Sequence, residues 1–315
     1  MYLEEHGEIQ ERFPHMWCGC SMSRLESLPF YHAYPGARVL TIGTSSCNMS
    51  CRYCSNAYVA KEDPAWQQSG MAEYSAKELV RLAEKLECHA IVFNVNEPTV
   101  SLLSLEELAV EARRAGLPMG CLTNGYMTEE GTERLARIFS FVNVAIKGLS
   151  DDFCRQFLGI PTVDSILRNI RALARTHHLE ITTPIIQGVN DRDIDAIAGF
   201  LASVDPEIPW HVFRLLPEHD MKESEYPSID GINQALQSAR QRLPYVYFHN
   251  FVGSDWVNTL CPGCGVEVIE RFSLGCGGDR LSKYHCEDGR CPKCRTPIRI
   301  HGERIAWGTK RAVTR

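Results

Sequence analysis

Cysteines are the residues of this sequence with the most obvious chemistry. Three of them, Cys47, Cys51 and Cys54, lie in one short loop at spacings of four and three residues. Three thiolates so spaced can bind one side of a cubane iron–sulfur cluster, as short cysteine runs do in ferredoxins. No fourth cysteine lies nearby, so one iron would stay open to an external ligand. We therefore expect a [4Fe-4S] cluster here, with incidental thiols or part of a zinc site as the weaker alternatives.

A second group of cysteines lies near the end of the chain. Two Cys-x2-Cys knuckles, Cys261 with Cys264 and Cys291 with Cys294, can complete a tetrahedral shell of four sulfurs. Zn²⁺ is the first choice and a rubredoxin-like iron the second, since both accept this geometry. Between the knuckles, Cys276 and Cys286 could be a regulatory thiol pair, additional ligands or ordinary packed cysteines. Three others, Cys88, Cys121 and Cys154, fall within predicted elements and are expected to be buried.

Composition limits the classes of protein that this chain can be. It has 315 residues, 14 of them Cys, with 33 Lys+Arg against 39 Asp+Glu and a net charge of −6. No signal peptide or membrane span is visible, so we expect a cytoplasmic protein that does not bind membranes. A reducing cytosol disfavours disulfides and favours metal ligation for clustered cysteines. The net negative charge argues against nucleic-acid binding, although the sequence ends in a basic stretch.

The elements that must position these cysteines alternate between apolar runs and amphipathic segments. The expected strands are residues 38–43, 90–95, 119–124, 141–147, 179–186, 210–216 and 245–250. Ser75 with Glu78 and Ser104 with Glu107 are expected capping boxes at helix starts. Continuous apolar strands separated by helices indicate a buried parallel sheet.

We therefore predict an α/β fold, a partial (βα)6-type TIM barrel followed by a small four-cysteine zinc-ribbon or rubredoxin-like domain. The expected divisions are an N-terminal extension (1–37), the barrel (38–254), the metal ribbon (255–300) and a basic tail (301–315).

The first cysteine loop resembles that of a known family. Cys-x3-Cys-x2-Cys with an aromatic residue, Tyr53, before the last cysteine is the pattern of radical S-adenosylmethionine (radical SAM) enzymes. The segments NVNEPT, TNGYMTEE, VNVAIKG and TPIIQGVND and the two knuckles resemble the AmmeMemoRadiSam branch, which is akin to pyruvate formate-lyase activating enzymes. This resemblance implies SAM as cofactor, its reductive cleavage to a 5′-deoxyadenosyl radical, and an electron donor such as flavodoxin or ferredoxin.

The resemblance also implies roles for residues at the ends of the expected strands. In it, Asn96 and Glu97 hold the SAM ammonium, Thr123 and Asn124 bond ribose or carboxylate, and Lys147 and His219 contact SAM. The alternatives are a helix N-terminal turn for Asn96 and Glu97, an Asn-Gly turn for Thr123 and Asn124, and a merely solvated side chain for Lys147. His211 lies early in its strand and is expected to be a packed, structural histidine.

The sequence departs from the activating enzymes in two places. Those enzymes carry two aspartates that bind a cation beside SAM, whereas this chain has Leu122 and Ala145, so we do not expect that cation site. Upstream, only Cys18 and Cys20 remain of the several cysteines of the branch; they could ligate a metal, act as a redox pair or lie in a plain loop.

The leading hypothesis is a radical SAM enzyme that abstracts hydrogen from an unidentified substrate, with a peptide or protein slightly preferred. One alternative is an activase that installs a glycyl radical on a partner enzyme. The other is a non-catalytic zinc-ribbon module that binds nucleic acid or protein.

Overall fold

A nine-stranded sheet, seven strands of it parallel, forms the centre of the protein. The computed structural model describes residues 1–61, 70–306 and 308. The strand order is β11-β10-β9-β8-β7-β6-β4-β3-β5. The parallel strands are β4 (Arg38–Gly43), β6 (Ala90–Phe93), β7 (Met119–Thr123), β8 (Phe141–Ala145), β9 (His178–Ile185), β10 (Trp210–Arg214) and β11 (Val246–His249). Each predicted strand is present, so the expected partial barrel is confirmed.

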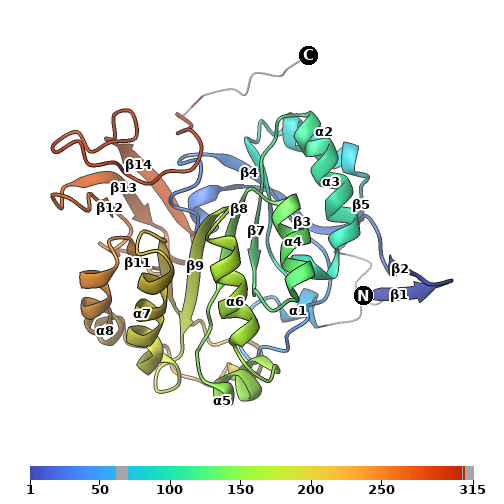
Figure 1. Cartoon of the computed structure of the whole chain (residues 1–315), viewed down its shortest axis with the longest axis horizontal. Coiled ribbons are helices and arrows are strands. Elements are labelled where there is room, and N and C mark those ends of the chain that lie inside the picture. Colours follow the sequence, from blue (N-terminus) through green and yellow to red (C-terminus); the bar gives the residue numbers. More distant parts are fainter. Residues whose placement is uncertain (62–69, 307, 309–315) are drawn as a thin grey trace.

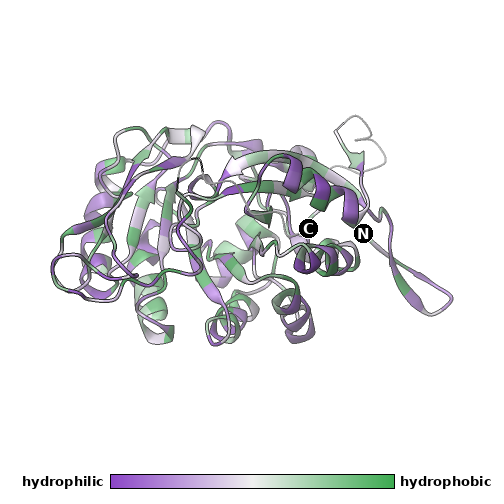
Figure 2. Cartoon of the chain, turned by 90° about the horizontal axis from the view of Figure 1, so that it is seen from above, coloured by the Kyte–Doolittle hydropathy of each residue, from purple (hydrophilic) through white to green (hydrophobic). Residues whose placement is uncertain are grey.

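The longer helices cover the outer face of this sheet, and the two short helices α1 and α5 lie near the carboxyl ends of its strands (Figure 1). They are α1 (Ala57–Ala60), α2 (Ala76–Lys85), α3 (Leu102–Arg114), α4 (Glu129–Ile138), α5 (Asp151–Phe153), α6 (Asp164–Leu173), α7 (Ile194–Val204) and α8 (Ile229–Arg242). Short 3-10 or π turns are η1 (Leu25–Ser27), η3 (Pro98–Val100), η4 (Cys154–Leu158), η5 (Asp191–Asp193), η6 (His219–Met221) and η7 (Gly275–Gly277). Figure 2 shows several helices in a row beside the curved sheet, with mixed hydrophobic and hydrophilic faces. Alternate strand residues such as Leu40, Ile91 and Val142 pack against them in the main core.

One of the two predicted capping boxes is confirmed. Ser75 accepts from the Glu78 amide, and the Glu78 side chain accepts from the Ser75 amide. The box at Ser104 was wrong, because α3 begins at Leu102 and Ser104 lies inside it. There the Ser104 amide and hydroxyl both donate to Glu11 of the N-terminal hairpin instead. Ser104 therefore bonds to Glu11, which lies outside the helix, and not to Glu107.

The N-terminal residues contribute to the sheet and fill the barrel. The strands β1 (Tyr2–Glu5) and β2 (Glu8–Glu11) form a hairpin that projects from the body of the protein (Figure 1). The strand β3 (Met16–Arg24) pairs antiparallel with β4 and, over its first two residues, with β5 (Ala72–Glu73). In the segment that follows β3, Leu25, Phe30 and Ala33 are buried in one hydrophobic cluster. Their partners there are Val39, Val92 and Phe141, which lie on the concave face of the sheet. Residues 25–37 thus fill much of the barrel interior.

The C-terminal ribbon lies against the barrel wall. It consists of β12 (Thr259–Leu260), β13 (Glu267–Ser273) and β14 (Asp279–Tyr284), beside β11 in Figure 1. The returning chain bonds β11 through the amide of Phe248 and the carbonyl of Trp256, 3.1 Å apart. At its other edge, the Ser27 hydroxyl donates to the Asp279 carbonyl at 3.2 Å. The ribbon therefore spans the open side of the barrel, from β11 to the turn η1 that precedes β4.

None of the helices in the described part of the chain has both the length and the apolar character of a membrane span.

Candidate active site

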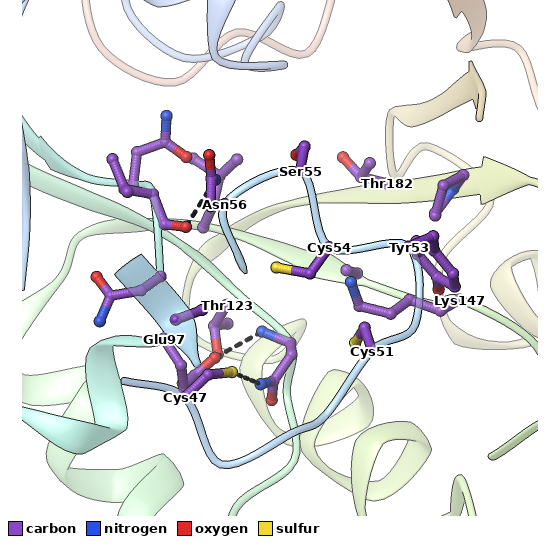
Figure 3. A pocket seen from close by; sticks show the side chains of 18 of the residues that line it. Cys47, Cys51, Tyr53, Cys54, Ser55, Asn56, Glu97, Thr123, Lys147 and Thr182 are labelled. Carbon is purple, nitrogen blue, oxygen red and sulfur yellow. Dashed lines mark hydrogen bonds between the residues drawn. The ribbon is translucent and has the colours of Figure 1, made fainter. Parts of the chain in front are cut away.

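A cavity of about 330 Å³ opens at the carboxyl end of the parallel strands. Barrel folds carry their active sites at this end, because the loops that follow successive strands meet there. The structure brings most of the predicted site residues together around this cavity (Figure 3): Cys47, Cys51, Tyr53, Cys54, Asn96, Glu97, Thr123, Asn124 and Lys147. His219 is the predicted residue that is not part of the lining.

The loop that carries the three cysteines is fastened to the turn η4. The amides of Ser50 and Arg52 donate to the carbonyls of Leu158 and Phe157, each at 2.9 Å. Gly159, which ends η4 with a φ of 72°, allows the close approach, because a Cβ there would lie 3.1 Å from that of Ser50. The backbone of the cysteine loop is thus held by partners outside the loop.

The three thiols suit a polynuclear cluster better than a single ion. All three line the cavity, yet the ribbon is the only place in the described ranges where three or more His, Cys, Asp or Glu ligand atoms gather closely enough for one ion. Burial, with a smaller contribution from Glu97, raises the pKa of Cys47 to about 12, and burial also raises the pKa of Cys54. These groups become thiolates when a strongly positive centre binds them. The donor set fits an iron–sulfur cluster.

Glu97 is the centre of a buried hydrogen-bond network. Its carboxylate accepts from the Asn124 amide at 2.8 Å and from the Thr123 hydroxyl at 2.9 and 3.0 Å. The amide and hydroxyl of Thr99 add contacts of 3.2 and 3.0 Å. Burial raises the pKa of Glu97, and these donors oppose that shift. The side chain therefore ties the loop after β6 to the loop after β7 while it faces the cavity.

Asn96 and Asn124 use their amides to connect loops. The Asn96 side chain accepts from the Thr44 amide at 2.9 Å and donates to the Ser46 carbonyl at 2.8 Å. That of Asn124 donates to Asn48 at 2.7 Å and lies 3.5 Å from the Cys47 sulfur. Both residues position the cysteine loop in addition to lining the cavity.

Lys147 and Tyr53 both line the cavity and lie close to each other. The Lys147 ammonium lies 5.7 Å from the centre of the Tyr53 ring, within the range of a cation–π contact. No described carboxylate forms a salt bridge with this ammonium, and the buried Tyr53 hydroxyl has no hydrogen-bond partner. A cation without a counter-ion at a cavity is suited to hold an anionic group such as a carboxylate.

The two departures from the activating enzymes are visible in the cavity. Leu122 and Ala145 both line it, and Glu97 is the single acidic residue in the described lining. Since Glu97 is already bonded to Thr99, Thr123 and Asn124, the lining offers no pair of free carboxylates for a cation.

His219 lies beside the cysteine loop and outside the cavity lining. It begins the turn η6, with a φ of 52°, and its Nε2 is 3.4 Å from the Asp220 carboxylate. The Asp220 amide donates to the Arg52 carbonyl at 2.9 Å, which places η6 against the loop. The predicted SAM contact of His219 has no support from the lining of this cavity.

Sequence reasoning missed the polar floor of the cavity. Asn143, Thr182 and Phe213 line it from inside the barrel, below Ala145 and Pro184. The Thr182 hydroxyl donates to Asn143 at 2.8 Å, and the Asn143 amide donates to the Pro29 carbonyl at 2.8 Å. The signal was present, because inward-facing positions alternate along each strand and Asn143 lies two residues before Ala145 in β8.

The other cysteines divide by location. Cys88, Cys121 and Cys154 are buried, as predicted, and Cys276 is exposed. Cys286 packs against the ribbon core. Cys18 and Cys20 lie on β3, so the plain-loop interpretation was wrong, and the Cys18 thiol donates to the Thr44 carbonyl at 2.9 Å. Burial raises the pKa of both Cys18 and Cys20 to about 11, which disfavours a reactive thiolate.

The ribbon cysteines form a separate four-sulfur site, as predicted. The sulfur atoms of Cys261, Cys264, Cys291 and Cys294 all lie within 4.8 Å of one another. Amides of the knuckles close tight turns: Gly265 donates to the Cys261 carbonyl and Arg295 to that of Cys291. Hydrogen bonds from Thr296 lower the pKa of Cys294 to about 6, which favours the thiolate that a metal ion needs. The geometry fits one tetrahedrally bound ion.

Comparisons with known proteins agree with this geometry. An uncharacterised protein of Methanocaldococcus jannaschii is 27% identical over 90% of this chain and 84% of its own length. The isethionate sulfite-lyase activating enzyme of Oleidesulfovibrio alaskensis is 32% identical over 44% of this chain and 45% of its own length. Among solved structures, Streptococcus suis SuiB bound to S-adenosylmethionine shares the fold, with a TM-score of 0.52 at 13% identity over 67% of this chain and 49% of SuiB.

The family comparison covers the part of the chain that builds the cavity. The model of the radical SAM superfamily matches residues 41–201, just over half of the chain, and this stretch contains the cysteine loop and the strands from β6 to β9. Sequence pattern, barrel and cavity lining are consistent with that match, and the chain belongs to the radical SAM superfamily.

Proposed function

We propose that this protein binds a [4Fe-4S] cluster through Cys47, Cys51 and Cys54 and SAM in the adjoining cavity, and that it abstracts a hydrogen atom from a substrate. Superfamily membership implies an enzyme with these two cofactors. When bound, they supply the reductive cleavage of SAM to methionine and a 5′-deoxyadenosyl radical. The proposal rests on one observation: three cysteines share one cavity with Lys147 and Glu97, and the described lining contains no further cysteine or histidine.

The residues around the cavity have distinct proposed roles. Lys147 offers an ammonium group to the SAM carboxylate, and Glu97 offers its charge to the SAM ammonium. Thr123 and Asn124 face the cavity from the same network and would orient the cofactor. His219 remains a proposed contact for the ribose of SAM, although its side chain is not part of the cavity lining.

The shape of the cavity favours a polypeptide substrate. Its volume, about 330 Å³, is at the low end for a pocket that holds one cofactor-sized molecule. Its floor is closed by Asn143, Thr182 and Phe213, and residues 25–37 fill the space beneath. A substrate must therefore present its reactive group from the mouth, which suits a side chain or loop of a larger molecule.

An activase is the second candidate function. The similarity to an activating enzyme of Oleidesulfovibrio alaskensis favours it, while Leu122 and Ala145 replace the two aspartates expected in that group. An activase would leave a stable glycyl radical on a partner enzyme, which electron paramagnetic resonance detects. A flavodoxin or ferredoxin remains the proposed electron donor. The cytoplasm remains the proposed compartment, because none of the 14 cysteines is in a disulfide and the clustered ones suit metal sites.

For the ribbon we propose Zn²⁺, with iron as the alternative. The four sulfurs fit both ions. Metal analysis of protein purified without added metal distinguishes them, with one zinc per chain as the expected result.

Anaerobic reconstitution tests the cluster assignment. The wild-type protein should bind four irons and turn brown, Cys47→Ser should not, and the exposed Cys276→Ser should behave like the wild type. If Cys47→Ser kept the full iron content in the cluster, the ligand assignment would be wrong. Supplying macromolecular and small-molecule fractions separately then tests the substrate class, through the yield of 5′-deoxyadenosine above the level without substrate.

A further inference from the structure

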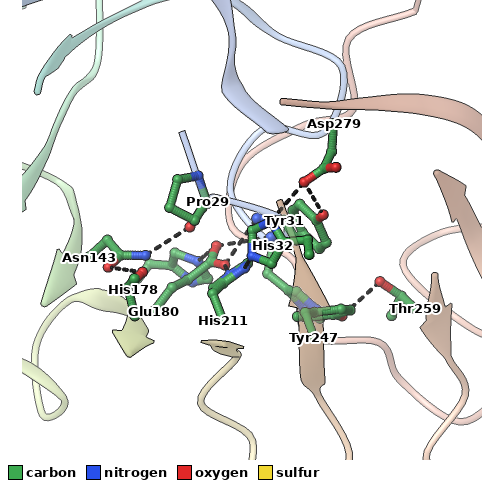
Figure 4. A network of polar contacts seen from close by, with 12 residues as sticks. Pro29, Tyr31, His32, Asn143, His178, Glu180, His211, Tyr247, Thr259 and Asp279 are labelled. Atoms are coloured by element: carbon green, nitrogen blue, oxygen red, sulfur yellow. Dashed lines mark hydrogen bonds and ion pairs between the residues drawn. The ribbon is translucent and has the colours of Figure 1, made fainter. Parts of the chain in front are cut away.

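A chain of buried polar side chains joins the ribbon to the barrel beneath the cavity (Figure 4). It starts at Glu180 in β9, continues through His211 in β10 and His249 in β11, and ends at Asp279 in β14. The three contacts measure 2.6 Å from Glu180 to His211, 3.2 Å between the two imidazoles, and 2.8 Å from His249 to Asp279. All four side chains are almost completely buried.

Both ends of this chain are carboxylates that accept hydrogen bonds from several donors, Asp279 through its Oδ2. Glu180 also accepts from the amides of Tyr31 and His32, each at 2.9 Å, and from His178 at 2.9 Å. Asp279 also accepts from the Tyr31 hydroxyl at 2.6 Å. Burial opposes ionisation, but the histidine hydrogen bonds outweigh it and hold the pKa of Glu180 well below its usual range. The pKa of Asp279 is lowered by His249 in the same way.

The hydrogen-bond pattern fixes the number of protons in the chain. His211 Nε2 faces Glu180, and His249 Nδ1 faces Asp279, so each ring gives one N–H to a carboxylate. A neutral imidazole has only one N–H, which leaves a bare lone pair on the other nitrogen. Those nitrogens, His211 Nδ1 and His249 Nε2, face each other at 3.2 Å. Two lone pairs cannot form a hydrogen bond, so one more proton is required between them.

The surroundings balance the charge of that proton. The charged and titratable groups that face the two imidazoles and their partners are Glu180 and His178 of β9, Asp279 of β14, Arg271 of β13, Tyr247 of β11, and Tyr31 and His32 of the barrel-filling segment. Arg271 lies 4.1 Å above the Tyr31 ring and donates to the Tyr31 carbonyl at 2.7 Å. With two carboxylates, one guanidinium and one shared proton, the buried group is neutral overall. Glu26 also faces Arg271, and burial raises its pKa.

We infer that His211 and His249 share one proton, and that this proton fastens the ribbon and the segment around Tyr31 under the floor of the active-site cavity. The His249 ring lies 4.0 Å from that of Phe213, which lines the cavity. Glu180 and Asp279 are thus positioning residues for the cavity floor, acting through the two histidines.

Proton release on unfolding tests this inference. At about pH 8.5, roughly two units above the ordinary histidine pKa of about 6.5, an unfolded histidine holds almost no extra proton. The wild-type protein should therefore release one more proton per chain on unfolding than His249→Asn, which keeps a donor to Asp279 but cannot carry the charge. The measurement is calorimetry in two buffers of different ionisation enthalpy. Protons taken up by the metal-binding cysteines on unfolding are the same in both proteins and cancel.

The linkage also predicts a difference in pH dependence. Because the folded wild type holds the extra proton, its folding equilibrium constant should fall up to tenfold more per pH unit above about pH 6.5 than that of His249→Asn. Tyr31→Phe removes a donor to Asp279 without removing the pair, so it should keep the wild-type slope. Equal proton release from wild type and His249→Asn would overturn the inference.

A measurement on the wild type alone covers the case in which His249→Asn does not fold. Nitrogen NMR of protein labelled at its 11 histidines should show one imidazolium, with both nitrogens protonated, that persists at about pH 8.5. If every histidine were neutral there, the shared proton would not exist.

Discussion

Glu97→Gln is the substitution that best separates a structural from a cofactor-binding role in the cavity. The carboxylate oxygen that accepts from the Asn124 amide at 2.8 Å would be replaced by an NH2 group, or the bonds to Thr99 would be lost on the other side. One buried donor is then left unsatisfied, which costs about 1–3 kcal/mol. For a protein of this size we expect Tm to fall by roughly 2–6 °C.

The same substitution removes the charge proposed to face the SAM ammonium. A hydrogen bond to a charged partner contributes about 1.5–3 kcal/mol, so Kd for SAM should rise about 10- to 100-fold. The assays are calorimetric titration of the cluster-loaded protein with SAM and thermal unfolding of the same sample.

Glu106→Gln is the matched control, because Glu106 does not line the cavity. Glu106→Gln, at a partly exposed pair with Arg134, should change Tm by at most roughly 2 °C and leave SAM affinity unchanged. If Glu97→Gln lowered Tm but left Kd for SAM unchanged, Glu97 would only connect the two loops. If Tm did not change, the hydrogen-bond network itself would be in doubt.

Three further predictions follow from the structure. Lys147→Met should raise Kd for SAM about tenfold or more with little effect on Tm, because the ammonium has no described carboxylate partner; an unchanged Kd in the calorimetric titration would argue against the carboxylate contact. Cys294→Ser should lose the ribbon metal and lower Tm by several degrees, whereas Cys276→Ser should do neither, as metal analysis and thermal unfolding of both variants will show. Glu180 has a lowered folded-state pKa, so its stabilisation is complete above the unfolded pKa of about 4.3 and is lost as pH falls through the folded value. Unfolding titrations between about pH 3 and 6 should therefore show a steeper loss of stability for the wild type than for Glu180→Gln, and parallel curves would contradict the ionised state of Glu180.

The sequence allowed the barrel and both cysteine sites to be predicted, because their signals are local. Continuous apolar runs specified the parallel strands, and short cysteine spacings specified the two groups of sulfurs. The Ser104 capping box was wrong because Glu11, far away in sequence, supplies the bond. No local pattern could show that Asp279 reaches His249 or that Pro29 receives the Asn143 amide, since these contacts depend on how the ribbon and the N-terminal segment fold back.

The site residues also divide into those with a local sequence signal and those without one. Glu97 and Lys147 were found because each follows a strand, where barrel loops meet. Asn143 and Phe213 lie inside the strands, where an inward-facing polar or aromatic residue is interpreted first as part of the core. His219 was placed at the correct end of the barrel, but the turn that carries it packs against Arg52 and leaves it outside the lining.

In the proposed function, SAM bound in this cavity is cleaved by one-electron reduction. The most direct test is anaerobic incubation of the cluster-loaded wild-type protein with dithionite and SAM, followed by chromatography for 5′-deoxyadenosine and methionine. We expect both products in equal amounts from the wild type and from Cys276→Ser, and neither from Cys51→Ser. If fully loaded wild-type protein that binds SAM formed no 5′-deoxyadenosine, the proposed chemistry would be contradicted.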